Sequence, residues 1–468
     1  MNDSGGMYAP AYGRRAVTAG ILHFGVGNFH RSHQAAYLDR LLRKGEAVDW
    51  GIIGVGLFPQ DARLGEILRA QDFSYTLVEL GADGHQVATR ISAIIDFLHA
   101  PSEPERVREY LADPRIRVVS LTITEGGYNT SDVTGEFDTA NVDIVADVNA
   151  PYPRTVFGIL AAGLYLRRAR GIPPFAVVSC DNIPGNGGVT RRALVAFARL
   201  AYGVEFADWI NRTVSFPDSM VDRITPATTD AERALVRDVF GIDDAWPVVC
   251  EPFTQWVIED DFPLGRPAWE GVGGQLVDDV GPYELMKLRL LNGSHQAMAH
   301  VGLLRGHRYV HEAMADAEVV GLVRRYMADE ALDSLPLVPG IDLGQYMSQL
   351  VERFANPHIR DTLDRLATDT SDRLPKFLVP VAAELSRAGK PAPAAAGVLA
   401  AWAVRAAREL RAGNSLNDRQ AERLGAALRT VDADPVSFLA NREWFGDLID
   451  DARFAADFQR AYRVYERS

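Results

Sequence analysis

Cysteine is scarce in this chain of 468 residues, which has only Cys180 and Cys250. Two isolated cysteines cannot build a disulfide framework, and free thiols suit a reducing compartment. The ten histidines form no HExxH motif, and the stretch "HEAM" at position 311 has no second histidine at the required spacing. We therefore expect a cytoplasmic protein that binds no metal.

Positive charge and long apolar runs are lacking too. The 49 lysines and arginines are outnumbered by 62 acidic residues, for a net charge of −13. This balance argues against a nucleic-acid partner or an anionic membrane. The first 20 residues contain no apolar signal segment, and no stretch is long enough to span a bilayer. We expect a small-molecule partner and a protein that is a monomer or a weak homo-oligomer.

The chain does contain short apolar strands that alternate with helices. Residues 20–24, 50–58, 117–124 and 175–180 are predicted buried strands, with helices between them. This alternation is typical of a parallel, doubly wound sheet. From residue 282 onward helical periodicity dominates, most clearly over 395–410 and 437–468. The sequence therefore predicts an α/β fold, with a Rossmann-type doubly wound domain over 1–281 and a mainly α-helical domain over 282–468.

A glycine turn, Gly25-Val26-Gly27, follows the first predicted strand and opens a helix. In that context backbone N–H groups can approach the pyrophosphate of a dinucleotide. His30 replaces the third glycine of the usual fingerprint, and such turns also occur as simple connections. The expected cofactor contacts lie in the turn and in the first residues of the helix: Gly25, Val26, Gly27, Asn28, Phe29 and Arg31. His33 is a further candidate, and Asn28, Arg31 and His33 have helix capping as their alternative.

Asp61 lies beyond the second predicted strand, where a carboxylate can accept hydrogen bonds from the adenosine ribose. A negative charge there repels a 2′-phosphate, which favours NAD over NADP. The nearby Arg63 weakens that preference. The alternative for Asp61 is a helix N-cap.

The stretch "KLRLLNGSH" places Lys287, Asn292 and His295 in one apolar helix. On an α-helical wheel of about 100° per residue, with Lys287 at zero, His295 falls at about 80° and Asn292 at about 140°. Glu284, one turn upstream, falls at about 60°. Burial lowers the pKa of a lysine, which would make it a useful base. The alternative is an amphipathic helix whose polar residues happen to cluster.

Two polar loops follow the later strands: "TITEGGYN" (122–129) and "SCDNIPGNG" (179–187). Ligands of open parallel sheets bind at the carboxyl ends of the strands, so Asn182 and Asn186 are candidate amide donors. Asparagine in a glycine-rich turn also has purely conformational explanations. Since no set of metal ligands is visible, an amino-acid base would have to take the proton in any hydride transfer from an alcohol.

Together these segments resemble the polyol-specific long-chain dehydrogenase/reductase family over nearly the whole chain. The most specific block is Lys287 with Asn292 and His295 at their spacing. Other blocks similar to the family's mannitol 2-dehydrogenases, in the same order, are "HFGVGNFHRSHQA", "SLTITEGGYN", "SCDNIPGNGGVTR", "MVDRITP" and "DDAWPVVCEPFTQWVIED".

The resemblance implies a metal-independent, NAD-dependent enzyme. It implies that Lys287 is the general base, that Asn292 and Asn182 polarise the reacting oxygen, and that His295 orients the polyol. Glu284 could pass the proton to water or simply pair with a cation. The positions matched to substrate contacts are Asp222, Arg365 and Arg373. Relatives can carry lysine in place of Arg373, and some have Glu-Asp where this chain has Gln60-Asp61.

The expected reaction is the reversible oxidation of D-mannitol to D-fructose with NAD. D-arabinitol 4-dehydrogenase and fructuronate reductase activities remain open, because such relatives share the lysine block. A non-catalytic NAD- and sugar-binding sensor is an alternative of a different class, although a sensor needs no base. A lyase or dehydratase that uses Lys287 and a metal is a third alternative, weakened by the missing ligands.

Overall fold

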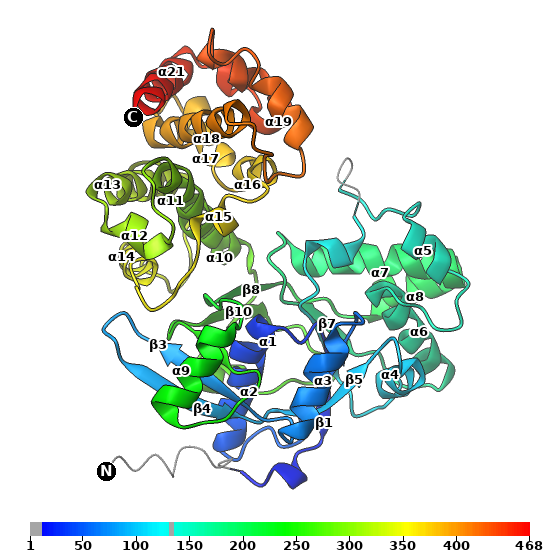
Figure 1. The fold of residues 1–468 in the computed structure, drawn as a ribbon. Helices are drawn as coiled ribbons and strands as arrows, with labels where there is room; N and C mark the ends of the chain where they lie inside the picture. The colour runs from blue at the N-terminus through cyan, green and yellow to red at the C-terminus, as the bar shows by residue number, and fades with distance from the viewer. Residues whose placement is uncertain (1–11, 131–134) are drawn as a thin grey trace. The chain divides into compact units, whose positions relative to one another are not determined.

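The computed structural model describes residues 12–130 and 135–468, which form two compact units (Figure 1). Unit 1 runs to Gly81 and from His85 to Val280, while unit 2 comprises 82–84 and Gly281–Ser468. The division lies next to the predicted boundary at 281. We expect no signal segment in the first 20 residues, and residues 1–11 of that stretch lie outside the described residues. Within the described ranges, no helix has the length and apolar character needed to cross a membrane.

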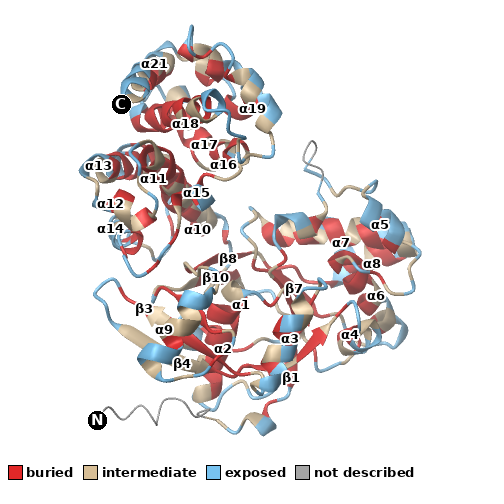
Figure 2. Ribbon diagram, in the orientation of Figure 1, coloured by how far each residue is buried: buried red, intermediate tan, exposed pale blue. Residues whose placement is uncertain are grey.

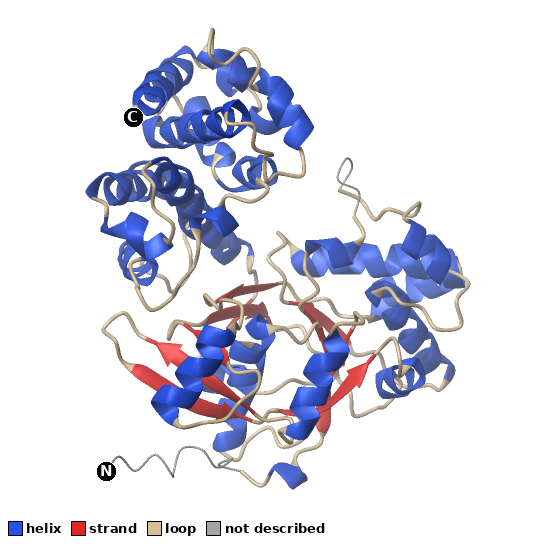
Figure 3. Ribbon diagram, in the orientation of Figure 1, coloured by secondary structure: helices blue, strands red, loops and turns tan. Residues whose placement is uncertain are grey.

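Unit 1 is built on a five-stranded parallel sheet, whose strands are among those drawn in red in Figure 3. The first strand of the chain lies in the centre of this sheet. In sheet order the strands are β5 (Ile94–His99), β2 (Gly51–Gly56), β1 (Ala19–Phe24), β6 (Val118–Leu121) and β7 (Ala176–Ser179). The strand order extends from β1 toward both edges of the sheet, through β2 to β5 and through β6 to β7. This order defines a doubly wound sheet. The predicted Rossmann-type fold is confirmed.

Both faces of this sheet are buried, which explains why its strands are almost wholly apolar (Figure 2). On one face, Leu22 and Phe24 of β1 join a core with helices α4 (Pro104–Leu111), α6 (Val156–Ala169), α7 (Asn186–Tyr202) and α8 (Val204–Thr213). On the other face, Ile21 joins a core with α2 (Gln34–Arg43) and α3 (Asp61–Ala70). Among the described residues of unit 1, the other α-helices are α1 (Asn28–Ser32), α5 (Val142–Asp147) and α9 (Asp230–Phe240).

Two small sheets complete unit 1, and the apolar patterns of the sequence did not predict them. One contains β11 (Gln275–Val277), β10 (Gln255–Glu259) and β8 (Ser219–Asp222), and the other contains β4 (Gln86–Ile91), β3 (Tyr75–Leu80) and β9 (Val248–Cys250). Leu77 and Trp256 pack into the same core as α2 and α3. β8, β9 and β11 have only three or four residues each, too few for a clear alternating pattern, whereas β3 and β4 have six.

Unit 2 is helical throughout, with no strand among its described residues (Figure 3). Its α-helices are α10 (Gly281–Met286), α11 (Gly293–Leu304), α12 (Val310–Ala315), α13 (Ala317–Arg325), α14 (Leu343–Phe354), α15 (Leu363–Leu366), α16 (Thr370–Phe377), α17 (Val379–Arg387), α18 (Pro393–Arg411), α19 (Ala421–Ala427), α20 (Arg442–Phe445) and α21 (Ala452–Arg467). Two π-helical segments, η4 (Lys287–Asn292) and η5 (Tyr326–Ala331), interrupt this pattern. The expected helical domain is confirmed.

The C-terminal stretch 437–468 is less regular than its periodicity predicts. It is divided among two short 3-10 segments, α20 and α21. The break after α20 falls at Gly446, which has a positive φ of 56°, a conformation that glycine adopts without strain. Trp402 of α18 packs against Phe438 and Trp444, so the broken segment still contributes its aromatic rings to the core.

Candidate active site

The glycine turn after β1 is shaped for a close backbone approach. Gly25 has a φ of 90°, and a Cβ at this position would lie 2.1 Å from the Thr122 carbonyl oxygen. A Cβ at Gly27 would meet nothing nearer than the Gly25 oxygen, at 3.9 Å. Packing therefore requires glycine at position 25, whereas glycine at 27 leaves open space above the turn. This shape fits a pyrophosphate that approaches the backbone.

The side chains after the turn bind other parts of unit 1. Asn28 Nδ2 donates to the Pro226 carbonyl oxygen at 2.9 Å, and Asn28 Oδ1 accepts from Arg31 Nη2 at 2.6 Å. Arg31 is fully buried, and its Nη1 donates to the Trp246 carbonyl oxygen at 2.6 Å. No side chain caps α1. These contacts fix the turn in place, so any contact with a phosphate is expected mainly from the backbone.

His30, which stands where the third glycine would be, stacks on His23 with 3.4 Å between the ring centroids. Both side chains are fully buried. Burial lowers the pKa of His23 to about 3 and that of His30 well below its ordinary value. Both rings are therefore neutral at physiological pH, and His23 bonds Ser120 and Thr122 at the end of β6. His30 therefore packs α1 against β1 through His23, and it provides no charge for a ligand.

Asp61 is the first residue of α3, and its Oδ2 accepts from Leu57 N at 2.8 Å and Phe58 N at 2.9 Å. This oxygen fixes the loop that follows β2. Asp61 is not the N-cap of α3, because Gln60 holds that position, without a side-chain cap hydrogen bond. The Oδ1 atom is the one left to accept from a ribose. Arg63 lies over the Trp246 ring, 5.6 Å from its centroid.

The loops after β6 and β7 are joined by one partly buried carboxylate. Asp181 accepts hydrogen bonds from Ile123 N, Thr124 N and the Tyr128 hydroxyl, at 3.0, 2.8 and 2.8 Å. Thr124 has φ 62° and ψ 167°, a region that is essentially restricted to glycine. The Asp181 carboxylate therefore holds a strained backbone at the carboxyl edge of the sheet.

Asn186 is not available as an amide donor to a ligand, contrary to the sequence-based expectation. It is buried, its Nδ2 donates to the Ser219 carbonyl oxygen at 2.7 Å, and its Oδ1 accepts from Ser219 N at 3.0 Å. These bonds join the loop after β7 to β8. Asn182 is exposed in the same loop, and Asp222 is the last residue of β8.

In unit 2, the helix with Lys287 departs from a regular α-helical wheel. The Gly293 N–H donates to the Leu288 carbonyl oxygen, five residues back, as in a π-helix. Five residues then span only a little more than one turn, so Asn292 lies on the side of the helix that carries Lys287 and not about 140° away. His295 follows three residues later in α11, on the same side. Lys287 is buried, while Asn292 and His295 are partly exposed.

The two candidate arginines lie together around α15, beside this helix. Arg365 makes a two-pronged ion pair with Asp361, with Nε–Oδ1 at 2.7 Å and Nη2–Oδ2 at 2.5 Å. Arg373 Nη1 donates to the carbonyl oxygens of Arg365 and Leu366. Gln296 of α11 donates to the same Leu366 oxygen at 2.9 Å, which joins α15 to the Lys287 helix. Glu284 lies in α10, one turn before Lys287.

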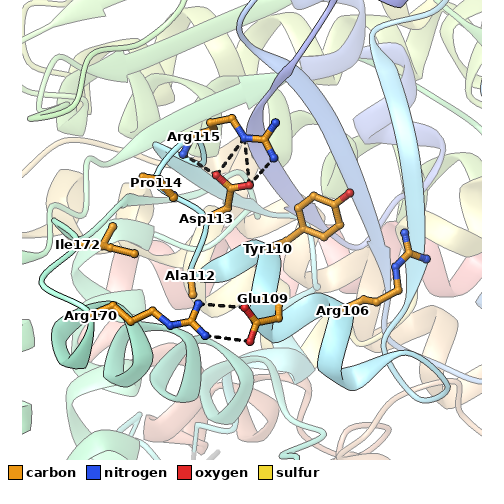
Figure 4. A pocket seen from close by; sticks show the side chains of 9 residues that line it. All are labelled: Arg106, Glu109, Tyr110, Ala112, Asp113, Pro114, Arg115, Arg170 and Ile172. Atoms are coloured by element: carbon orange, nitrogen blue, oxygen red, sulfur yellow. Dashed lines mark hydrogen bonds and ion pairs between the residues drawn. The ribbon is translucent and has the colours of Figure 1, made fainter.

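One pocket lies elsewhere, near the amino end of β6 (Figure 4). Its volume is about 510 Å³. Arg170 pairs with Glu109 at 2.9 Å and Arg115 with Asp113 at 2.5 Å, so its main charges are compensated within the protein (Figure 4). Ligands of doubly wound sheets bind at the opposite, carboxyl edge. We assign this pocket no part in catalysis.

No group of three or more potential metal-ligating side chains lies together in residues 12–130 and 135–468. Three supporting residues were not predicted from the sequence: Thr124, Asp181 and Tyr326. Thr124 and Asp181 lie within the two polar loops noted in the sequence. The strained backbone of Thr124 and its hydrogen bond to Asp181 depend on contact between loops that are far apart in the chain. Tyr326 had no signal at all in the sequence.

A doubly wound domain with an open glycine turn, followed by a helical domain with an aligned lysine, asparagine and histidine, defines a long-chain dehydrogenase of Rossmann type. Family models agree with this class. The model described as "Mannitol dehydrogenase Rossmann domain" matches residues 19–271, and "Mannitol dehydrogenase C-terminal domain" matches 279–466. The chain belongs to the mannitol dehydrogenase family.

Individual relatives resemble the chain over almost its full length. Mannitol 2-dehydrogenase of Cereibacter sphaeroides is 44% identical, over 98% of this chain and 96% of the relative. The structure of Pseudomonas fluorescens mannitol 2-dehydrogenase in ternary complex with NAD and D-mannitol has a TM-score of 0.86 and 47% identity, covering 97% of this chain and 93% of that one. A substrate-free D-sorbitol dehydrogenase structure has a TM-score of 0.89 and 34% identity, covering 97% and 94%.

Proposed function

We propose that the protein is an NAD-dependent mannitol 2-dehydrogenase that interconverts D-mannitol and D-fructose. The main support is the likeness to the Pseudomonas fluorescens enzyme, whose structure contains NAD and D-mannitol. The proposal assigns cofactor binding to unit 1 and deprotonation of the polyol to unit 2. Bound NAD supplies the acceptor for the hydride that leaves the alcohol carbon.

In unit 1, the backbone of Gly25, Val26 and Gly27 holds the pyrophosphate, because the space above Gly27 is open. Asn28, Phe29 and Arg31 belong to the same cofactor-binding segment. Asp61 accepts hydrogen bonds from the adenosine ribose through Oδ1, while Oδ2 keeps the loop after β2 in place. The negative charge of Asp61 favours NAD over NADP.

In unit 2, Lys287 takes the proton of the reacting hydroxyl. A lysine in a largely buried position loses part of its hydration, which favours the neutral amine needed for a base. Asn292, on the side of the helix that carries Lys287, donates to the oxygen that becomes the carbonyl. Asn182 of unit 1 is a further proposed amide donor to the substrate. His295 orients the polyol, and Glu284 passes the proton on to water.

The arginines favour a neutral substrate over a uronate. The Arg365 guanidinium is bound to the Asp361 carboxylate in a two-pronged pair, so its charge is already compensated. Arg373 donates to backbone carbonyl oxygens. We propose that both arginines bind hydroxyl groups of the polyol, and that Asp222 of unit 1 is a further substrate contact. A fructuronate reductase would need a cation free to pair with the substrate carboxylate.

The reaction is tested by mixing the protein with NAD and a panel of D-mannitol, D-arabinitol and D-sorbitol, and following NADH absorbance. We expect the highest kcat/KM for mannitol, and reduction of fructose with NADH in reverse. D-sorbitol is included because one relative of similar fold is a D-sorbitol dehydrogenase. Faster reduction of fructuronate than of fructose would contradict the assignment of mannitol as the substrate. No turnover with any of these compounds would favour the alternative of a non-catalytic sensor that binds NAD and sugar.

The metal-independent mechanism is tested in the same assay. The base is proposed to be an amine, so prolonged treatment with EDTA should leave the rate unchanged. A loss of activity that zinc restores would contradict this part of the proposal.

We further propose that the protein works in the cytoplasm as a monomer or a weak homo-oligomer. Burial raises the pKa of Cys180 and Cys250 to about 12, so both thiols are inert in a reducing environment. Light scattering across a dilution series measures the oligomeric state, and a tetramer stable at nanomolar concentration would contradict it.

A further inference from the structure

The helix with the proposed base contains a carbonyl group that the helix itself does not satisfy in the usual way. In an α-helix the Gly293 N–H would donate to the carbonyl oxygen of Arg289, four residues back. Here it donates to Leu288, five residues back. The π turn therefore removes the Arg289 carbonyl from its ordinary place in the hydrogen-bond ladder. A buried carbonyl needs a partner from elsewhere.

Tyr326 provides that partner. Its hydroxyl donates to the Arg289 carbonyl oxygen at 3.0 Å, and its side chain is fully buried. Burial raises the pKa of this hydroxyl well above its ordinary value, so the group stays protonated and remains a donor. A Cβ at Gly293 would lie 2.2 Å from the hydroxyl oxygen. The hydroxyl reaches the carbonyl because residue 293 has no side chain.

Arg289 is held at its other end as well. Its guanidinium makes a two-pronged ion pair with Glu384 of α17, at 2.6 and 2.7 Å, and also donates to the Ser334 carbonyl oxygen. The Arg289 side chain is 7% exposed. Tyr326 thus fixes the backbone of the π turn, and Glu384 fixes the side chain that leaves it.

The π turn decides which residues share a side of the helix. With the turn in place, Asn292 lies on the side that carries Lys287, whereas an uninterrupted α-helix would turn them about 140° apart. We propose that Tyr326 is a positioning residue, which stabilises the π turn at Arg289 and so keeps Lys287 and Asn292 on one side of the helix. This inference rests on the proposed function, in which these two residues act on the same oxygen.

Tyr326→Phe removes the hydroxyl and keeps the ring. We expect kcat for mannitol oxidation to fall at least tenfold, while KM for NAD changes less than twofold, because NAD is assigned to unit 1. The acidic limb of the pH–rate profile for mannitol oxidation, where the base becomes protonated, should shift by at least half a pH unit, since Lys287 loses its fixed surroundings. A loss of stability alone would lower the amount of active enzyme without moving the pH profile.

Two further variants make the test specific. Tyr462→Phe is the matched control: this tyrosine is also fully buried in unit 2, and its hydroxyl bonds Asp432 at 3.4 Å. Its pH profile should be that of the wild type. Gly293→Ala places a methyl group against the Tyr326 hydroxyl and should reproduce the shift. The double variant should be little worse than either single one, because both remove the same contact.

A direct measurement of Lys287 separates this inference from the proposed function. The chain has four lysines, Lys44, Lys287, Lys376 and Lys390, so ¹³C-methylated lysines can be followed individually by NMR as pH is varied. In Tyr326→Phe the Lys287 midpoint should move toward that of free lysine. If the wild type oxidises mannitol and Tyr326→Phe retains its kcat and pH profile, the inference is overturned and the function stands. If the wild type oxidises no polyol, an unchanged Lys287 midpoint overturns the inference and a moved one supports it.

Discussion

The Thr124 N–H donates a 2.8 Å hydrogen bond to Asp181 Oδ1, across the two loops that leave β6 and β7. Thr124 makes this contact in a backbone conformation that is costly for a β-branched residue, on the order of 1–3 kcal/mol. Strain of this size persists where the surroundings hold it in place. The Asp181 carboxylate, with its three hydrogen bonds, is what holds it here.

Thr124→Gly should relieve that strain. Because glycine adopts this φ freely, we expect a higher Tm than for the wild type. The loop should also become less ordered, so the affinity for NADH, measured by fluorescence titration, should fall. Asn129→Gly is the control, since Asn129 has a φ of 50° in the left-handed region that asparagine tolerates. A lower Tm for Thr124→Gly would show that the strain is not released.

Lys287→Ala should abolish most turnover and leave NADH binding intact. General-base catalysis contributes a factor of about 10² to 10⁴, so kcat should fall by that order. Lys390→Ala is the control in the same unit, because Lys390 is exposed and pairs with Asp333 at 2.8 Å. Steady-state rates together with NADH titration measure both effects. Activity near that of the wild type at neutral pH would remove Lys287 from its role.

Asp61→Asn should narrow the preference for NAD over NADP. The variant keeps an oxygen that can accept from Leu57 and Phe58, so the loop should stay in place, but it loses the charge that repels a 2′-phosphate. The ratio of kcat/KM values for the two cofactors measures the change. Equal use of both cofactors by the wild type would argue against a role of this carboxylate in cofactor choice.

Glu330 should make the protein less stable as the pH rises from about 5 to 8. Its carboxylate accepts from Ala394 N and Ala395 N at the start of α18, and burial raises its pKa to about 7. The folded state therefore binds this proton more tightly than the unfolded state. The resulting stability is complete below the unfolded pKa and is lost as the pH rises through 7, by roughly 3 kcal/mol.

Thermal unfolding at several pH values measures this contribution. Glu330→Gln cannot titrate, so its Tm should depend less on pH over this range than that of the wild type. Glu312→Gln is the control. Glu312 also accepts from backbone N–H groups, but those bonds lower the pKa of its carboxyl, which is already ionised at pH 5. Equal pH dependence in the wild type and Glu330→Gln would contradict the assignment.

Patterns within a single element were readable from the sequence. The strand, turn and helix around Gly25 and the helical character beyond residue 281 follow from local apolar periodicity. The family resemblance then indicated Lys287, Asn292 and His295, whose roles stay predictions. In the structure these three residues share one side of a helix because the helix contains a π turn. The wheel drawn from the sequence assumed a regular α-helix and so could not show this turn.

Properties that depend on distant residues were not readable. Asn186 looked like a ligand for substrate, yet its amide is occupied by Ser219, 33 residues away. Arg365 was matched to a substrate contact, and the sequence did not show that Asp361 pairs with its guanidinium. Tyr326 acts on a carbonyl 37 residues before it, and only because residue 293 is glycine. Each outcome is decided by tertiary packing, which no local pattern encodes.

The π turn also bears on how the length of this segment can change. A π turn contains one residue more than the α-helical turn it replaces, so the five-residue step from Lys287 to Asn292 is equivalent to an α-helical step of four plus an insertion. Deleting one residue between them would keep the two side chains on one side of a regular helix. The Arg289 carbonyl would then regain an N–H partner, and the Tyr326 hydroxyl would lose its acceptor. The inserted residue of the π turn therefore depends on the hydroxyl of Tyr326. We expect that a chain lacking the inserted residue would no longer need a tyrosine at position 326.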